Sequence, residues 1–241
     1  MNLKITSIKL NKNGKYVVTI DNEKYNLYQD TILKYLLFSK KEIDNTLFEN
    51  IIKDNNFYDA YYKIIKFVSI RLRTESEIRK KLNTLFILKK DQDKIIDKLK
   101  EQGYLNDELY IKSYINDKIN LSLEGPEKVK RDLLKNGFKK EDILKYLCLF
   151  EDINEERINK IINKKLKANH NLSKKMFIVK VGNDLRNLGY TNYREILENI
   201  DFDDKDIYKK EYDKIYNKLI KKYPPEKADI LTKQKLYIKG F

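Results

Sequence analysis

The chain has 241 residues, of which 41% are hydrophobic and 37% are charged, so it can bury a core beneath a heavily solvated surface. Its single cysteine, Cys148, excludes an intramolecular disulfide and a metal cage built from cysteines. No apolar run approaches the roughly 20 residues that cross a bilayer, and the first residues lack a secretory signal, so we expect a cytoplasmic protein without a membrane partner. Only 7 glycines and 3 prolines favour helices over a β-sandwich or barrel.

Basic residues exceed acidic residues mainly in the later part of the chain. Residues 1–60 contain nine Lys and eight acidic residues, whereas residues 61–241 contain 42 basic and 29 acidic residues. Such an excess attracts a polyanion or an acidic protein surface. Lys outnumbers Arg by 44 to 7, which is also the composition that an AT-rich genome imposes on any protein, so the excess has two explanations.

The first thirty residues alternate between apolar and polar side chains, which is the period of a β-strand. Asn-Gly at residues 13–14 and Asp-Asn at residues 21–22 have the turn chemistry that separates strands in a meander. We therefore expect three strands, then a helix with Asp30 as its N-cap and a second helix around residues 47–52. These elements predict a small β-containing domain at residues 1–58. The apolar strand positions are Ile8, Leu10, Tyr16, Val18, Ile20, Tyr25 and Leu27.

An apolar pattern then recurs along the chain. Apolar residues at relative positions 0, 3, 4 and 8 occur four times, and the first two intervals between copies are both 47 residues, whereas the third is 54. The spacing places each copy on the buried face of a helix. The copies are Ile64, Phe67, Val68, Leu72; Ile111, Tyr114, Ile115, Ile119; Ile158, Ile161, Ile162, Leu166; and Tyr212, Ile215, Tyr216, Ile220.

A second shared feature follows the later copies: a helix that ends in Leu, three residues, Gly and an aromatic residue. The Gly is expected to end the helix in a left-handed conformation, where a side chain costs about 1 kcal/mol. In the first unit Phe86 replaces this Gly, so we expect that turn to close differently. A third short helix is expected at residues 143–150 and 193–200. The motif occurs as Leu133 to Gly137-Phe138, Leu185 to Gly189-Tyr190 and Leu236 to Gly240-Phe241.

These features predict a mainly α protein, in which tandem three-helix repeats form an elongated, curved, solenoid-like array after the small N-terminal domain. Complete repeats are expected at residues 59–106, 107–150 and 151–201, and a partial fourth repeat, which lacks its third helix, at residues 202–241.

Two local motifs lie in the first repeat. Thr74 and Glu77 have the spacing of a capping box, in which each side chain accepts a hydrogen bond from the other residue's backbone. Arg71 and Arg73 precede it at the end of the previous helix, where they either complement the negative end of that helix or contact phosphate or acidic side chains. Gly103 stops a helix, and Asp107 is expected to cap the next one.

The helix that begins at Gly125-Pro126 carries basic residues on one face. Lys128, Arg131 and Lys135 lie at spacings of three and four, opposite Val129 and Leu133. Such a face is either simply solvated or a contact surface. The third repeat has a looser version of this face at Lys175, Lys180 and Arg186.

Catalytic signatures are missing from the sequence. The only histidine, His170, lies in an Asn-rich connection and is expected to be a surface residue. No two glycines are two residues apart, so neither a dinucleotide fingerprint nor a P-loop is present. We expect a protein that is not an enzyme and that uses no metal and no cofactor.

The chain resembles the RecX family of regulatory proteins, which act on the RecA recombinase. The first repeat matches the family pattern at residues 73–78, Leu82 and residues 103–107. The second repeat matches it at five positions. The matching residues there are Gly125, Val129, Leu133, Gly137 and Phe138. Residues 1–58 are similar to the extension of the Gram-positive branch, and the end of the chain is similar to the family's final unit, cut short. Two residues depart from the pattern: Ile111 stands where the family usually has a small residue, and Phe86 stands where it has Gly.

This resemblance implies a monomeric, non-enzymatic modulator of DNA repair and recombination. It would lie along the groove of the RecA filament on single-stranded DNA and limit ATP turnover and strand exchange. Its partners would be the RecA filament and DNA, single- or double-stranded. The candidate contact residues are Arg71, Arg73, Arg79, Lys81, Lys128, Arg131, Lys135, Lys175, Lys180 and Arg186.

Two other functions remain open at this stage. In one, the Gly-joined helix pairs are helix-turn-helix motifs of a DNA-binding protein, although residues 139–150 and 193–200 offer few base-reading groups. In the other, the chain is a helical scaffold that binds only proteins. Salt-dependent binding to single-stranded DNA distinguishes all three.

Overall fold

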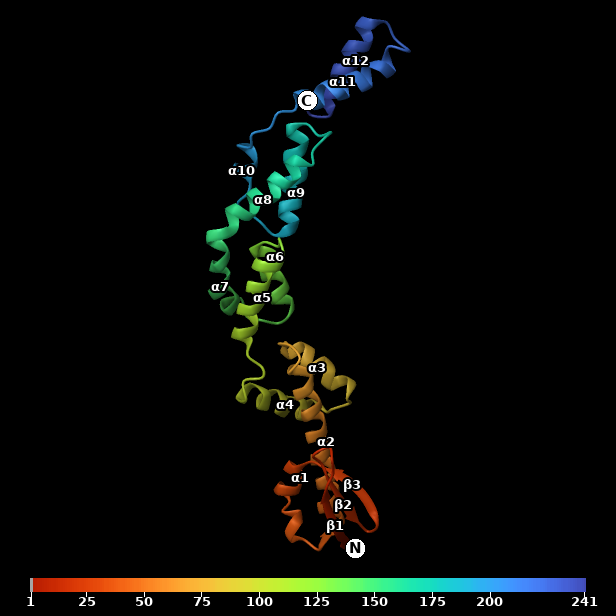
Figure 1. The fold of residues 1–241 in the computed structure, drawn as a ribbon, viewed down its shortest axis with the longest axis vertical. Helices are drawn as coiled ribbons and strands as arrows, with labels where there is room; N and C mark the ends of the chain where they lie inside the picture. The colour runs from red at the N-terminus through yellow and green to blue at the C-terminus, as the bar shows by residue number, and fades with distance from the viewer. Residues whose placement is uncertain (1) are drawn as a thin grey trace. The chain divides into compact units, whose positions relative to one another are not determined.

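The computed structural model describes residues 2–241 as a small antiparallel sheet followed by helices (Figure 1). The chain divides into two compact units, of which the first ends at Tyr110 and the second is Ile111–Phe241. The elements of the first unit are β1 (Asn2–Leu10), β2 (Tyr16–Ile20), β3 (Glu23–Leu27), α1 (Gln29–Lys34), η1 (Leu37–Ser39), β4 (Glu42–Asp44), α2 (Asn45–Val68), α3 (Glu75–Thr84) and α4 (Lys89–Glu101).

The remaining elements are helical. Helix α5 begins in the first unit and continues into the second. The elements from residue 107 onward are α5 (Asp107–Leu121), α6 (Pro126–Lys135), α7 (Lys140–Leu147), η2 (Cys148–Ile153), α8 (Asn154–Lys167), α9 (Lys174–Leu188), α10 (Arg194–Glu198), α11 (Lys205–Leu219) and α12 (Pro225–Ile238).

The N-terminal sheet has four strands in the order β3-β2-β1-β4, one more than the sequence predicted. The predicted meander is present, and Asp21 and Asn22 both adopt the positive φ angles that the tight turn between β2 and β3 requires. The fourth strand, β4, pairs with the start of β1. It escaped prediction because its three residues contain only one buried apolar side chain, Ile43.

The expected N-cap at Asp30 is wrong. The N-cap of α1 is Tyr28, two residues earlier, so the helix begins at Gln29 and Asp30 lies in its first turn. The Asp30 carboxylate instead accepts a hydrogen bond from the hydroxyl of Tyr62 on α2, at 2.7 Å. The Asp30 side chain, which the local pattern assigned to a helix cap, therefore bonds to a residue that is far from it in the sequence.

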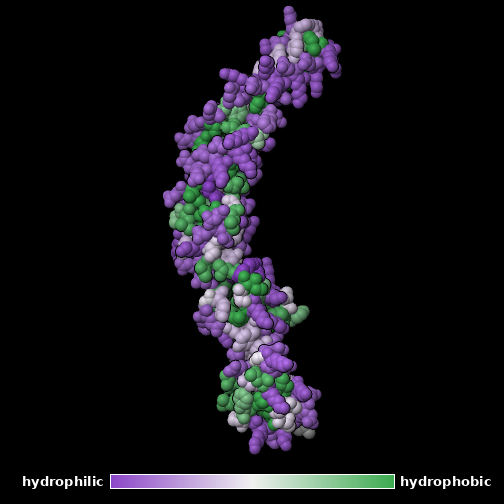
Figure 2. Space-filling view, in the orientation of Figure 1, coloured by the Kyte–Doolittle hydropathy of each residue, from purple (hydrophilic) through white to green (hydrophobic). Residues whose placement is uncertain are grey.

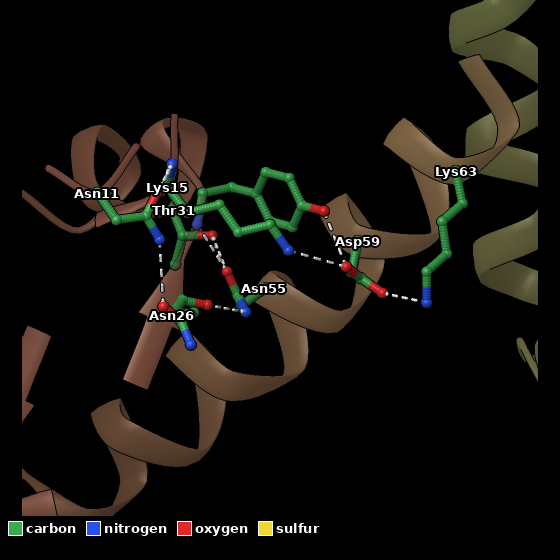
Figure 3. A network of polar contacts seen from close by, with 8 residues as sticks. Asn11, Lys15, Asn26, Thr31, Asn55, Asp59 and Lys63 are labelled. Atoms are coloured by element: carbon green, nitrogen blue, oxygen red, sulfur yellow. Dashed lines mark hydrogen bonds and ion pairs between the residues drawn. The ribbon is translucent and has the colours of Figure 1, made fainter. Parts of the chain in front are cut away.

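Helix α2 is continuous from the sheet to the first repeat, so no break occurs at residues 58–59. A polar network fixes the sheet and α1 to it (Figure 3). The Asp59 carboxylate accepts from Tyr28 at 2.8 Å and pairs with Lys15 at 3.2 Å and Lys63 at 2.7 Å. Asn55 accepts from the Tyr28 amide at 2.9 Å and donates to a strand carbonyl.

The first repeat consists of the second half of α2 with α3 and α4. The buried face of α2 carries Tyr61, Ile64 and Val68, which pack against apolar residues of α3 and α4 such as Leu82 and Leu99. Leu72, the last position of the predicted pattern, lies beyond the helix and is exposed. The capping box is confirmed, since the Glu77 amide donates to Thr74 Oγ1 at 3.2 Å and the Thr74 amide donates to Glu77 Oε2 at 3.0 Å.

The turn after α3 closes in the same way as the glycine turns, so the expectation that it closes differently is wrong. Phe86 itself adopts the left-handed conformation, with φ of 56°, and the Ile87 amide reaches back to the Leu82 carbonyl at 3.3 Å. The buried Gln92 side chain holds this turn by donating to the Ile87 carbonyl at 2.8 Å and to Asn83 at 2.7 Å. A tertiary contact thus maintains a backbone conformation that phenylalanine disfavours.

The second repeat comprises α5, α6, α7 and η2, and the third comprises α8, α9 and α10. The recurring apolar pattern lies on α5 and α8, where Ile111, Ile115, Ile158 and Ile162 are buried. Helix α5 is capped by the Asn106 side chain, which accepts from the Leu109 amide at 2.9 Å, so the expected cap at Asp107 is wrong by one residue. Helices α11 and α12 then pack against each other as a pair.

The predicted glycine ends are confirmed. Gly137, Gly189 and Gly240 adopt positive φ angles of 92°, 89° and 82°. The aromatic residue after each glycine donates its amide to the carbonyl of the Leu that begins the motif, with N–O distances of 3.0 to 3.3 Å. These bonds satisfy carbonyls that the end of a helix leaves without partners.

Hydrophilic side chains predominate on the face drawn in Figure 2, and apolar side chains form only small groups on it. Among residues 2–241, no helix combines the length and the hydropathy that crossing a bilayer requires.

Candidate functional site

The ten candidate contact residues divide into those that bind other parts of the protein and those that do not. Arg71 and Arg73 lie in the turn between α2 and α3, past the end of α2 rather than on it. Arg71 pairs with Glu77 at 2.6 Å. Arg73 reaches the same carboxylate at 3.4 Å, stacks over the Phe67 ring at 4.0 Å and donates to the Phe67 carbonyl at 3.4 Å.

Glu77 is therefore the centre of this turn. Burial opposes its ionisation, but the Thr74 amide and the Arg71 guanidinium outweigh that effect and hold the pKa of Glu77 below its usual value. The Arg73 side chain is only 14% exposed, so its main role is to support the α2–α3 turn.

Arg79, on α3, also has internal partners. It pairs with Glu75 at 2.9 Å and with Asp93 of α4 at 2.7 Å, and Lys100 of α4 pairs with Glu75 at 2.8 Å. These bonds connect α3 to α4. Lys81, by contrast, is exposed and has no ion pair within residues 2–241.

The predicted basic face of α6 is only partly free. Lys128 pairs with Glu124 at 2.5 Å, and Lys118 reaches the same carboxylate at 2.6 Å. Hydrogen bonds from Lys118 and Lys128 hold the pKa of Glu124 below its usual value. Arg131 and Lys135 are exposed, and neither has an ion pair in the described part of the chain.

On α9, Lys175, Lys180 and Arg186 are all exposed, and none of them forms an ion pair with residues 2–241. Of the six candidate residues in the second unit, five therefore have no ion pair within residues 2–241, two on α6 and three on α9. Lys175 and Arg186 are eleven residues apart and share one side of α9, whereas Lys180 lies about 140° around the helix from Lys175. We call the five unpaired side chains of the two helices together the basic face of α6 and α9: Arg131, Lys135, Lys175, Lys180 and Arg186.

Helices α9 and α6 meet end to end. The carbonyls of Leu188 and Gly189, at the end of α9, accept hydrogen bonds from the amides of Gly125 (2.6 Å) and Glu127 (3.1 Å), at the start of α6. A Cβ at Gly125 would lie 2.8 Å from the Gly189 oxygen, so the two backbones can approach this closely only because both residues lack a side chain. The joint places the last turn of α9, which carries Arg186, beside the first turn of α6.

Arg157, on α8, holds this joint and was not identified from the sequence. Its guanidinium donates to the carbonyls of Ile119 (2.5 Å) and Ser122 (2.7 Å) and to the hydroxyl of Tyr190 (3.1 Å). The Tyr190 hydroxyl in turn donates to the Leu123 carbonyl at 3.2 Å. The sequence feature that could have identified Arg157 is the presence of Arg in a chain that mostly uses Lys. Only Arg presents a planar group of donors to several carbonyls at once.

A second joint of the same kind lies at the other end of α9. The Ser173 hydroxyl, at the N-cap of α9, donates to the Lys239 carbonyl at the end of α12 (2.8 Å). A Cβ at Gly240 would lie 3.0 Å from that hydroxyl. Helices α6, α9 and α12 thus follow one another end to end.

Groups suited to catalysis do not gather in this region. His170 is exposed, as predicted. Residues 2–241 contain no group of three or more His, Cys, Asp or Glu side chains arranged to hold a metal ion. The five basic side chains of α6 and α9 that lack ion pairs within residues 2–241 are suited to phosphate or carboxylate groups on a large partner.

Relatives of known identity resemble the chain over almost its whole length. It is 32% identical over 251 aligned residues to the regulatory protein RecX of Listeria monocytogenes serotype 4a, an alignment that covers 99% of this chain and 93% of the relative. It is 27% identical over 255 residues to the regulatory protein RecX of Staphylococcus carnosus. No family model matches the sequence.

Solved structures agree with these relatives. The crystal structure of a regulatory protein RecX superposes with a TM-score of 0.74 at 25% identity, covering 82% of this chain and all of that one. The crystal structure of RecX from Lactobacillus salivarius superposes with a TM-score of 0.52 at 26% identity and covers 60% of this chain and 94% of its own.

Proposed function

The chain belongs to the RecX family of regulatory proteins, and on this basis we propose that it binds the RecA recombinase filament on single-stranded DNA and lowers the filament's ATP hydrolysis and strand exchange. In this proposal it acts as a non-enzymatic monomer in the cytoplasm, without a metal or cofactor. Contact with a filament requires a surface that meets many repeated subunits or phosphates rather than a pocket for one small molecule.

The observation that supports this proposal is the basic face of α6 and α9. Its five side chains, Arg131, Lys135, Lys175, Lys180 and Arg186, have no ion pairs within residues 2–241. They lie on two helices whose ends are hydrogen-bonded to each other. Charged groups left free on helices that are fixed relative to each other favour a long, negatively charged partner.

The experiment that tests the proposal measures ATP hydrolysis by RecA on single-stranded DNA while the protein is added up to one molecule per RecA subunit. We expect the rate to fall in proportion to the protein bound. An unchanged rate at equal amounts would contradict the proposed function.

A second measurement identifies which negative partner the basic face contacts. If phosphates are contacted, binding to bare single-stranded DNA should weaken with salt, with a slope of about −0.7 for each phosphate neutralised. Binding to the filament without binding to bare DNA would assign the face to acidic RecA surfaces. Binding to one duplex sequence alone would favour the helix-turn-helix alternative instead.

A further inference from the structure

A groove of about 1140 Å³ lies between α8 and residues 190–201, the segment that contains α10. Its floor is apolar and continues into the core of the third repeat. The floor is lined by Ile158, Ile162, Leu166, Ile196 and Ile200. None of the ten candidate contact residues lines this groove, so it is separate from the basic face of α6 and α9.

The two walls of the groove present the same kinds of side chain. On α8, Glu155, Asn159 and Asn163 are spaced four residues apart and therefore form one ridge along the helix. The opposite wall carries Asn192, Glu195 and Asn199. A carboxylate and two amides thus line each side of an apolar floor.

The charge of the groove is opposite to that of the protein. Four carboxylates line it, no Lys or Arg does, and the chain as a whole has a net charge of +14. None of the four carboxylates has an ion pair or hydrogen bond within residues 2–241, so all four are available to a basic partner. The four are Glu151, Glu155, Glu195 and Asp201.

The amides of the groove are also unused. Five Asn side chains line it, and none of them makes a hydrogen bond within the described residues. The Oδ1 atom of one of them, Asn154, is buried without a partner. A side-chain amide both donates and accepts, so it can pair with the N–H and C=O groups of a peptide backbone. An extended peptide has those groups free, whereas a helix uses them internally.

We propose that this groove binds an extended, Lys- or Arg-bearing segment of a partner protein. The amides would hold the backbone of the segment, the floor would take alternate apolar side chains, and the carboxylates would pair with its basic side chains. The stretch of α8 that lines the groove is about 18 Å long, which matches about five or six residues of extended chain. Nucleic acid does not fit, because its phosphates would face four unpaired carboxylates. This proposal does not depend on the proposed action on RecA.

The test uses the full chain and a fluorescein-labelled, ten-residue peptide that alternates lysine with valine. Fluorescence anisotropy should show saturable binding, even though the net charges of protein and peptide repel each other. Replacing Glu155→Gln and Glu195→Gln together should weaken binding roughly tenfold or more. Asn159→Ala with Asn163→Ala should weaken it as well, without any change in charge.

The matched control is Glu49→Gln with Glu101→Gln, which changes the net charge equally at exposed residues outside the groove. It should bind the peptide within about twofold of the unmodified protein, and circular dichroism should be the same for all variants. Absence of peptide binding, equal losses in the groove and control variants, or equal binding of a peptide with glutamate in place of lysine would overturn the proposal. So would self-association, seen by sedimentation, that the Glu155/Glu195 variant abolishes, because the occupant would then be a second copy.

Discussion

The first repeat has the same architecture as the second and third repeats, but its basic candidate residues are mostly paired, whereas theirs are mostly unpaired. On and before α3, Arg71, Arg73 and Arg79 are bound to acidic side chains of the same unit. On α6 and α9, five of the six candidate residues have no ion pair in the described part of the chain. A basic residue can therefore be structural in one repeat and free to bind in the next. Whether a basic side chain is paired or free is decided by the carboxylates near it, and not by its position in the repeat.

The largest effect is expected at the joint of the second and third repeats. Replacing Arg157→Ala removes the donor to the carbonyls of Ile119 and Ser122 and leaves them without that partner. We expect a loss of about 3 kcal/mol in the free energy of unfolding. Arg186→Ala, at an exposed residue without an ion pair, should change it by less than about 0.5 kcal/mol. Urea denaturation of both variants makes the comparison, and similar values would show that Arg157 does not hold the joint.

A smaller loss is expected in the first repeat. Glu77→Ala removes one half of the capping box and the partner of Arg71. The expected cost is about 1 to 2 kcal/mol. Glu101→Ala, on an exposed residue of the same unit, is the control and should be nearly neutral in the same denaturation experiment. An unchanged midpoint for Glu77→Ala would show that the arginines near α3 are not held by this carboxylate.

The pH dependence of stability should carry the same signature. The pKa of Glu77 is lowered in the folded protein, so its stabilising contribution is complete above the unfolded pKa of about 4.3 and is lost as pH falls through the folded pKa. The stability difference between the unmodified protein and Glu77→Gln should therefore shrink as the pH is lowered below about 4. A difference that stays constant down to pH 3 would contradict this.

The smallest effect concerns the turn that distinguishes the repeats. Phe86 is 93% exposed and holds a φ of 56°, whereas Gly137 occupies the equivalent position in the second repeat. Phe86→Gly should stabilise the protein by up to about 1 kcal/mol, because it removes the strain and little packing. Gly137→Ala should destabilise by a similar amount, since its surroundings are open and only the backbone conformation opposes the new side chain. Thermal melts that move in the same direction for both would contradict the equivalence of the two turns.

Local pattern predicted the features that depend on local physics. The glycine ends, the capping box and the apolar faces of α5 and α8 followed from spacing alone, and the structure confirms them. The sequence around residues 54–56 did not indicate that α2 continues, because Asp and Asn favour turns. In the structure, Asn55 bonds to the backbone of β3 and of Tyr28, which removes it from competition with the helix.

The candidate site was harder to predict, because long-range pairing decides which charges are available. Nothing near Arg79 in sequence shows that Asp93 takes up its charge, fourteen residues later. The carbonyls that Arg157 binds lie 33 to 39 residues away. Lys128, predicted as part of a free face, bonds to Glu124 beside the joint. Sequence spacing identified the helix faces but could not identify their partners.

We propose that the protein binds the RecA filament through the unpaired basic face of α6 and α9. The direct test compares two variants that each lose three positive charges. In the first variant, Arg131, Lys135 and Lys180 are replaced with Gln. In the second, Gln replaces Lys209, Lys210 and Lys214, which are exposed residues of α11. Affinity for the RecA filament on single-stranded DNA should fall roughly tenfold or more in the first and by no more than about threefold in the second. Equal losses would contradict the claim, because a diffuse positive charge would then account for all of the binding.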